Sequence, residues 1–464
     1  MNLAQIVEVA RGDAVADLAL RNAKLINVYT GEIYQTDVII SADRILALGP
    51  GYQVRQEIDL GGRYVAPGFI DAHVHIESTM LNPIQFAHAV VTRGTTSVVS
   101  DPHEIANVCG LKGIQYMMDV SAGLPLTVFF NAPSCVPATH MSTAGADLDA
   151  EQLATLLAHP RLIGLAEMMN FPGLILGDPA VLAKIEAFQG RIVDGHAPSV
   201  SGTWLNAYAA AGVGSDHECT TPEEALERLR LGMYVYIREG TSERNLLELL
   251  PIVTIENSRR CCLCADDRHL TDIVDDGHID QFLRMAIAQG LDPITAIRMA
   301  TLNAAERFRL HDRGAIAPGK RADLVVFADL KDIKAELVFS GGQLVAKEGE
   351  PLGDWREPVV DETAVRNTIH LDWNDIDEST FHIKAAGDRA RVIGAVEGQV
   401  RTEHCIERIA RKGTLAVADV ARDILKMAVV ERHRCTGNLG LGFIQGFGLQ
   451  KGALAGSVAH DHHN

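Results

Sequence analysis

Residues 67–75 read Pro67-Gly68-Phe69-Ile70-Asp71-Ala72-His73-Val74-His75, an apolar run that ends in two histidines one residue apart. Side chains two residues apart on a strand leave from the same face, so both imidazoles can converge on one ion. Taken alone, the pair is more typical of exposed histidines that close an edge strand than of a metal site. The pattern of the following residues favours the metal-binding interpretation.

Short apolar runs recur every few tens of residues after this point, and segments with helical periodicity separate them. The runs cover residues 64–76, 95–100, 126–131, 162–167, 191–196, 212–217, 233–238 and 261–266. Eight strands that alternate with helices predict an α/β fold, a (β/α)8 TIM barrel that spans residues 64–313.

Nearly every run ends in polar or ionisable residues. These are His73 and His75, Asp101-Pro102-His103-Glu104, Glu167, His196, Asp216-His217-Glu218, Arg238-Glu239 and Asp266-Asp267. The active site of a (β/α)8 barrel lies at the carboxyl ends of its strands, so these side chains should face one mouth.

Length and charge limit the function classes. The chain has 464 residues, of which 47% are hydrophobic, and this predicts one large domain with smaller ones beside it. A net charge of -18 argues against a nucleic acid polymer or an anionic membrane as partner and favours a small neutral or cationic ligand. We expect a cytoplasmic protein, because neither a secretion signal nor a long apolar segment is evident.

At this point the chain resembles the amidohydrolase superfamily. The resemblance implies a metal site made of His73, His75, Glu167, His196, His217 and Asp266, with Glu167 in the place where many members have a carboxylated lysine. The closer resemblance is to the adenine deaminase branch. It rests on the motifs at 68–78, 101–105, 134–138, 164–169, 194–196, 237–240 and 266–268.

The resemblance implies hydrolysis of adenine to hypoxanthine and ammonia by a metal-activated hydroxide, as in purine salvage. Two divalent ions are implied, Mn²⁺ or Fe²⁺ with Zn²⁺ as an alternative. His73, His75 and Asp266 are assigned to one ion, and His196 and His217 to the other. Glu167 is available to both. Asp266 is the expected proton shuttle, with Glu167 able to share that role.

Six further residues near the expected mouth are candidates. Asp267 is predicted to accept a hydrogen bond from a purine N–H, Arg238 to orient carboxylates, and Ser134-Cys135 to wall the ring pocket. His103 and Glu104 are predicted to hold a further ion or a hydrogen bond just outside the ligands. A plain structural role is the alternative for each of them.

The flanking segments predict further domains. Residues 1–63 and 314–349 alternate like strands and are expected to meet in a small β-sandwich, although separate terminal decorations are an alternative. The acidic stretch 350–378 is typical of a linker. Residues 379–464 should form part of a C-terminal α+β domain, which the resembled family continues further.

Two alternatives to adenine deaminase stay open. One is another amidohydrolase that acts on a cyclic amide or aminated heterocycle, and the other is a shortened barrel with impaired catalysis. The oligomeric state is open as well, with a homodimer as one option.

Overall fold

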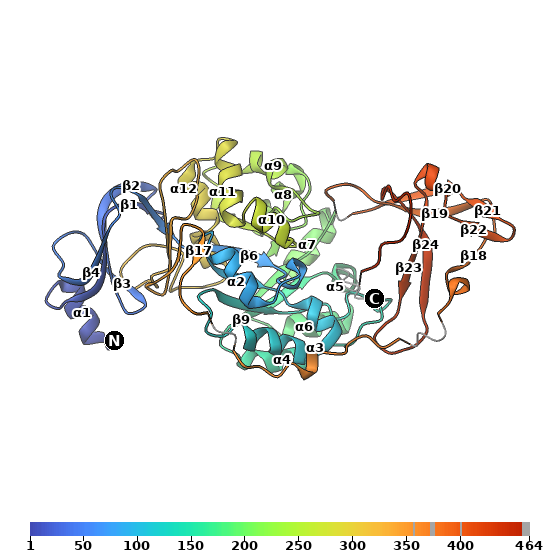
Figure 1. Ribbon diagram of the computed structural model, residues 1–464, viewed down its shortest axis with the longest axis horizontal. Coiled ribbons are helices and arrows are strands. Elements are labelled where there is room, and N and C mark those ends of the chain that lie inside the picture. The colour runs from blue at the N-terminus through green and yellow to red at the C-terminus, as the bar shows by residue number, and fades with distance from the viewer. Residues whose placement is uncertain (356–357, 372–375, 400, 457–464) are drawn as a thin grey trace.

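The computed structural model describes residues 1–355, 358–371, 376–399 and 401–456 (Figure 1). Three parts follow one another along the long axis: an N-terminal sheet, a central body of strands and helices, and a C-terminal group of strands. Within the described residues, no helix has both the length and the apolar character needed to span a bilayer.

The central body contains eight parallel strands, and each predicted apolar run overlaps one. They are β6 (Phe69–Val74), β7 (Thr95–Ser100), β8 (Thr127–Ala132), β9 (Leu162–Met168), β10 (Ile192–Gly195), β11 (Ser215–Asp216), β12 (Tyr234–Arg238) and β13 (Cys261–Cys264). Strands β6 to β10 pair in chain order, β11 to β13 pair in a second group, and a parallel bridge between Val74 and Asp266 joins β6 to the end of β13. This arrangement is a TIM-barrel-like α/β fold.

The first run differs from the prediction because it divides at Gly68. Residues before it form β5 (Tyr64–Pro67), which belongs to the N-terminal sheet, and residues after it form β6. A Cβ at Gly68 would lie 2.2 Å from Thr96 Oγ1, so only glycine permits this close approach. One apolar run therefore serves two sheets.

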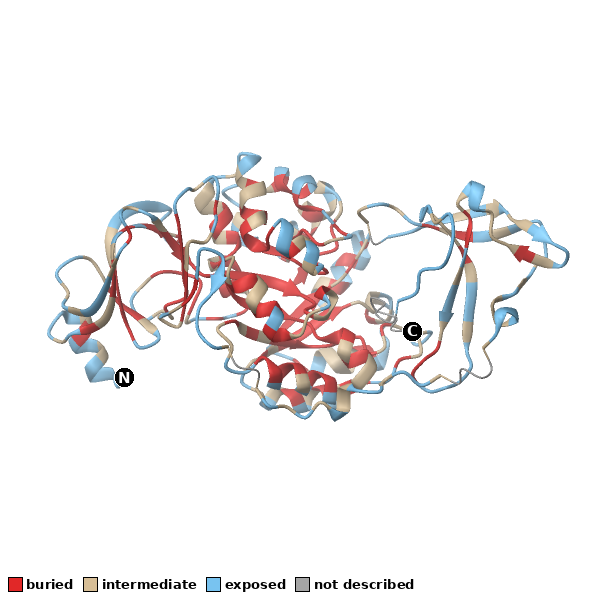
Figure 2. Ribbon diagram, in the orientation of Figure 1, coloured by how far each residue is buried: buried red, intermediate tan, exposed pale blue. Residues whose placement is uncertain are grey.

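Helices cover the strands and bury them. Their bounds are α2 (Pro83–Val91), α3 (His103–Val120), α4 (Ala150–Thr155), α5 (Phe171–Leu176), α6 (Pro179–Ala187), α7 (Gly202–Ala210), α8 (Pro222–Arg230), α9 (Leu246–Leu249), α10 (Leu270–Asp275), α11 (Ile279–Ala288), α12 (Pro293–Met299) and α13 (Leu302–Arg307). The Asn82 side chain caps α2, and Thr221 caps α8. Figure 2 shows the resulting core, with buried strands at the centre of the body.

The two segments that flank the central body share one sheet of nine strands. After α1 (Leu3–Arg11), the sheet contains β1 (Ala16–Asn27), β2 (Glu32–Ser41), β3 (Arg44–Leu48), β4 (Val54–Asp59), β5, β14 (Leu324–Phe327), β15 (Leu337–Ser340), β16 (Gln343–Lys347) and β17 (Glu350–Pro351). Antiparallel pairing of β5 with β14 connects the N-terminal strands to the later ones. Leu25, Val38 and Val326 are fully buried between them.

The C-terminal part differs from the predicted α+β class, because its described residues form only strands and short 3-10 turns. The strands are β18 (Ile383–Lys384), β19 (Arg389–Gly394), β20 (Glu403–Arg408), β21 (Ala410–Lys412), β22 (Leu415–Val417), β23 (Leu425–Val430) and β24 (Leu439–Gln445). Alternation with period two and frequent glycine disfavour helices here. Residues 457–464 lie outside the described part.

Candidate active site

Six ionisable side chains at the carboxyl ends of the barrel strands point into one space. They are His73 on β6 and His75 just after it, Glu167 on β9, His196 after β10, His217 after β11 and Asp266 after β13. All except His196 are at least 98% buried. The structure thus brings together the six residues of the expected metal site.

The first group consists of His73, His75, Glu167 and Asp266. Glu167 Oε1 lies 3.3 Å from His75 Nε2 and 3.7 Å from His73 Nε2. Asp266 Oδ1 lies 3.2 Å and 3.6 Å from the same two nitrogens. The Nδ1 atom of His75 donates to the Asp101 backbone carbonyl at 3.0 Å, because a carbonyl only accepts, and this leaves Nε2 as the ligand atom.

The second group shares Glu167 with the first. Glu167 Oε2 lies 2.7 Å from His196 Nδ1 and 3.1 Å from His217 Nε2. Glu218 joins this group, since its Oε1 is 3.4 Å from His196 Nδ1 and 3.5 Å from His217 Nε2. Glu218 was not predicted to have a role, although its position directly after His217 at the end of a strand could have indicated one.

Arg238 holds the outer oxygens of two carboxylates. Its guanidinium donates to both carboxylate oxygens of Glu218, one of them at 2.9 Å, and to Asp266 Oδ2 at 2.7 Å. Burial alone would lower the pKa of Arg238, but the charges of Glu218 and Asp266 raise it well above its usual value. The guanidinium therefore stays charged and holds both carboxylates by hydrogen bonds.

The charges of the carboxylates keep the neighbouring imidazoles protonated. Burial alone would lower the pKa of His217, but the charges of Glu167 and Asp266 outweigh it and raise that pKa to about 9. Although burial opposes ionisation, the His217 charge and nearby hydrogen bonds lower the pKa of Glu167 and of Asp266 well below their usual values. The pocket floor is thus an anionic site that favours positive charge.

These spacings fit divalent metal ions. Ligand atoms about 2.1 Å from one ion lie roughly 3.0–3.5 Å apart, close to the separations within both groups. The Nε2 atom of His73 is buried and forms no hydrogen bond with the described residues. Imidazole nitrogen and carboxylate oxygen are ligands for Mn²⁺, Fe²⁺ and Zn²⁺ alike.

The other predicted residues take different places. Asp267 lines the cavity, and its carboxylate accepts a hydrogen bond of 2.5 Å from the Ser78 hydroxyl. Ser134 and Cys135 are buried, and the Ser134 hydroxyl donates to the Glu167 backbone carbonyl at 2.5 Å. These two residues support the strand that carries Glu167 and are not among the residues that line the cavity.

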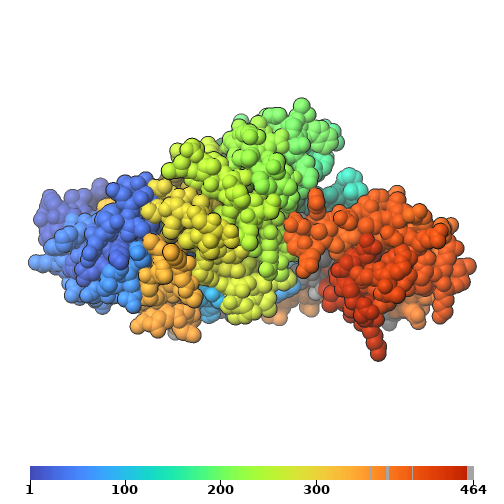
Figure 3. Space-filling view, turned by 90° about the horizontal axis from the view of Figure 1, so that it is seen from above, coloured from blue at the N-terminus to red at the C-terminus, as the bar shows by residue number. Residues whose placement is uncertain are grey.

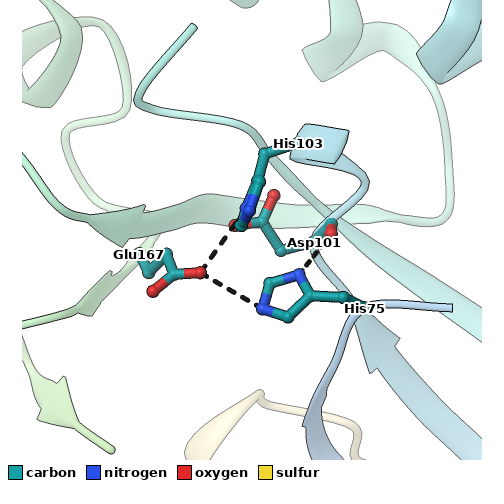
Figure 4. Close-up of side chains that lie close together, drawn as sticks. All are labelled: His75, Asp101, His103 and Glu167. Carbon is teal, nitrogen blue, oxygen red and sulfur yellow. Dashed lines mark hydrogen bonds and ion pairs between the residues drawn. The ribbon is translucent and has the colours of Figure 1, made fainter. Parts of the chain in front are cut away.

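His103 lies beside the first group, as Figure 4 shows. Its Nδ1 is 3.0 Å from Asp101 Oδ2 and 3.5 Å from Glu167 Oε1, while its Nε2 is 3.3 Å from Glu104 Oε1. All four residues are at least 96% buried. A further ion or a hydrogen bond outside the ligands stays a prediction for His103 and Glu104.

A cavity of about 250 Å³ opens above the two groups. Four of the six ligand-type residues line it, Glu167, His196, His217 and Asp266. The lining also includes Glu218, Arg238 and Asp267, together with Pro198, Ser199 and Thr220 from the loops after the strands. Gln399 and Arg401 also line it, and they come from the C-terminal part of the chain. Neither residue was predicted from the sequence, because no local pattern marks a loop that reaches a distant site.

Comparison with known proteins identifies the family. The amidohydrolase family model matches residues 64–347, and the model of the adenine deaminase C-terminal domain matches residues 399–464. The adenine deaminase of Desulfatibacillum aliphaticivorans is 51% identical over 99% of this chain and 80% of its own length. This chain belongs to the adenine deaminase family. Adenine deaminase 2 of Carboxydothermus hydrogenoformans is 48% identical with the same coverage of both chains.

Membership in this family makes the chain a hydrolase of a carbon–nitrogen bond that uses divalent metal. Solved structures support the fold over a smaller part of the molecule. Dihydropyrimidinase from Brevibacillus agri NCHU1002 superposes with a TM-score of 0.56 at 14% identity, covering 73% of this chain and 96% of that one.

Proposed function

We propose that this adenine deaminase family member converts adenine and water into hypoxanthine and ammonia in the cavity above Glu167. Two observations support the proposal. Relatives that carry this name match nearly the whole chain. Six ligand-type side chains converge at the barrel mouth, and four of them line a cavity of about 250 Å³. We take residues 64–313 as a closed (β/α)8 barrel, flanked by a β-sandwich of 1–63 with 314–349. A linker, 350–378, leads to the C-terminal domain.

Two divalent ions are assigned to the two groups of ligands. His73, His75 and Asp266 would hold one, His196 and His217 the other, and Glu167 would supply one oxygen to each. Glu218 is near enough to the second group to assist it. Such ions, when bound, lower the pKa of water toward 7 and so provide a nucleophile at neutral pH.

Asp266 is the proposed carrier of the proton. Water adds its oxygen to C6 of adenine. One of its protons passes through Asp266 to the exocyclic nitrogen, so that the C6–N bond breaks and ammonia leaves, and the other ends on N1 of hypoxanthine. Arg238 holds Asp266 Oδ2 at 2.7 Å, which leaves Oδ1 directed toward the histidines and the cavity. The outcome balances one water consumed against one ammonia released.

The test is turnover of adenine by metal-free protein that has been reloaded separately with Mn²⁺, Fe²⁺ or Zn²⁺. We expect hypoxanthine and ammonia in equal amounts, and about two ions per chain with the effective metal. His73→Ala should lose metal and turnover together, because it removes a buried ligand. Full metal content in that variant, or no turnover of adenine with any of the three metals, would contradict the proposal.

A further inference from the structure

A hairpin of the C-terminal domain reaches the barrel mouth. Strands β19 and β20 pair antiparallel up to Gly394 and Glu403, and the loop between them carries Gln399 and Arg401. Both side chains line the cavity whose other walls include His196 and Asp266, although more than 130 residues separate them from Asp266 in the sequence. Figure 3 shows the C-terminal strands as a lobe packed against the barrel.

The base of this hairpin is anchored. The Ala395 N–H donates to the Gln445 carbonyl at 2.9 Å, which joins the loop to β24. The Gln399 N–H donates to the Val396 carbonyl at 3.2 Å and closes a turn at Gly398, whose φ of 70° favours glycine. These two hydrogen bonds fix the backbone of the turn that carries Gln399.

The C-terminal part contacts the barrel at other points as well. An exposed ion pair of 2.7 Å joins Arg434 to Asp147, and the turn Thr363–Val365, which precedes the C-terminal strands, lies along α3. None of these residues lines the cavity.

If adenine is the substrate, as the proposed function states, its shape defines which atoms face the cavity wall opposite the ligands. C6 of adenine has to face the ligand groups, so the opposite edge of the ring, N3 and N9, faces the mouth. In the free base this edge presents an acceptor, N3, beside a donor, N9–H. A carboxamide presents a donor beside an acceptor and can bind both atoms at once.

The barrel does not offer an equivalent group among the described lining residues. Arg238 is committed to Glu218 and Asp266, and its Nε donates to Asn245 at 3.2 Å. Ser199 and Thr220 each contribute a single hydroxyl, and the Asp267 carboxylate, which accepts from Ser78, has no donor to offer N3. Gln399 is therefore the carboxamide in the wall of this cavity.

We propose that Gln399 binds the N3 and N9–H edge of the purine and thereby makes the site selective for the free base over purines substituted at N9. Arg401 forms the lip beside it. A site that binds an N–H discriminates strongly against an analogue that lacks it, because its own polar group is then left unpaired.

The experiment compares kcat/KM for adenine, 9-methyladenine and 3-deazaadenine in the metal-loaded protein and in Gln399→Ala. The wild-type protein should prefer adenine to 9-methyladenine by at least about 100-fold. In Gln399→Ala, kcat/KM for adenine should fall about 10- to 100-fold and the preference should shrink by a similar factor. Metal content should not change. Gln343→Ala, the same truncation at an exposed position on β16, is the matched control.

A Gln399→Ala protein with unchanged kcat/KM and unchanged preference would overturn the proposal, as would equal turnover of adenine and 9-methyladenine by the wild-type protein. Gln399→Glu keeps the acceptor and loses the donor, so it should lower activity on adenine more than on 3-deazaadenine. Failure of the proposed function has a different signature, because metal-loaded wild-type protein would then turn over none of the purines.

Discussion

The barrel mouth and the C-terminal lobe contribute to the same cavity in different ways. At the mouth, Glu167, Arg238 and Asp266 are at least 98% buried, and each is held by other charged groups. In the lobe, Arg401 is exposed, and a small cluster that includes Val392 and Phe443 forms the core. The contrast indicates that the closely packed barrel sets the ligand geometry, whereas the lobe extends side chains to the cavity from a distant part of the chain.

The largest expected effect lies at the mouth. Asp266→Asn should lower turnover of adenine by about three orders of magnitude or more, because an amide cannot carry the proton. Most of the bound metal should remain, since His73, His75 and Glu167 are still present. Kinetics and elemental analysis of one preparation measure both. Retention of about a tenth of the activity would assign the proton to another residue and weaken the contrast between the two regions.

An intermediate effect concerns the protons that the metal-free mouth holds. The raised pKa of His217, about 9, means that its imidazole is protonated at neutral pH, whereas a ligand must be neutral. Metal affinity should therefore rise with pH up to about 9, roughly tenfold per pH unit for each proton displaced. Calorimetry in buffers of different ionisation enthalpy counts these protons. His217→Ala should reduce the count, and His404→Ala, at an exposed position on β20, should not.

The smallest effect is expected in the lobe. Burial alone would raise the pKa of Glu431, but hydrogen bonds from Thr436, Arg434 and His433 outweigh it and lower that pKa to about 2. Because this pKa is depressed by folding, the stabilisation is complete above about pH 4.5 and is lost as the pH falls toward 2. Glu431→Gln should cost about 1–2 kcal/mol of lobe stability at pH 7 and remove this acid dependence.

Hydrogen exchange of residues 425–445 at several pH values measures that change. Metal content should stay as in the wild-type protein, because Glu431 neither belongs to the ligand groups nor lines the cavity. Loss of metal in Glu431→Gln would show that the lobe helps to shape the barrel mouth. That result would contradict the division of roles in which the barrel alone sets the ligand geometry.

The sequence predicted the barrel strands well because their signal is local. Buried parallel strands need short apolar runs, and the position of each polar residue at the end of a run places it at the carboxyl edge. The same reasoning was wrong about the α+β character of the C-terminal part. It also missed the break at Gly68, where an unbroken apolar pattern passes from one sheet to another.

By itself the sequence determined that eight strands would place His73, His75, Glu167, His196, His217 and Asp266 at one end of a barrel, because strand period and chain order need no knowledge of distant contacts. Only the tertiary structure decided that Arg238 joins Glu218 to Asp266 and that Gln399 reaches the same cavity. These relations depend on side-chain direction and on how separate parts of the chain dock. Both are set by packing across long sequence distances, which local patterns do not encode.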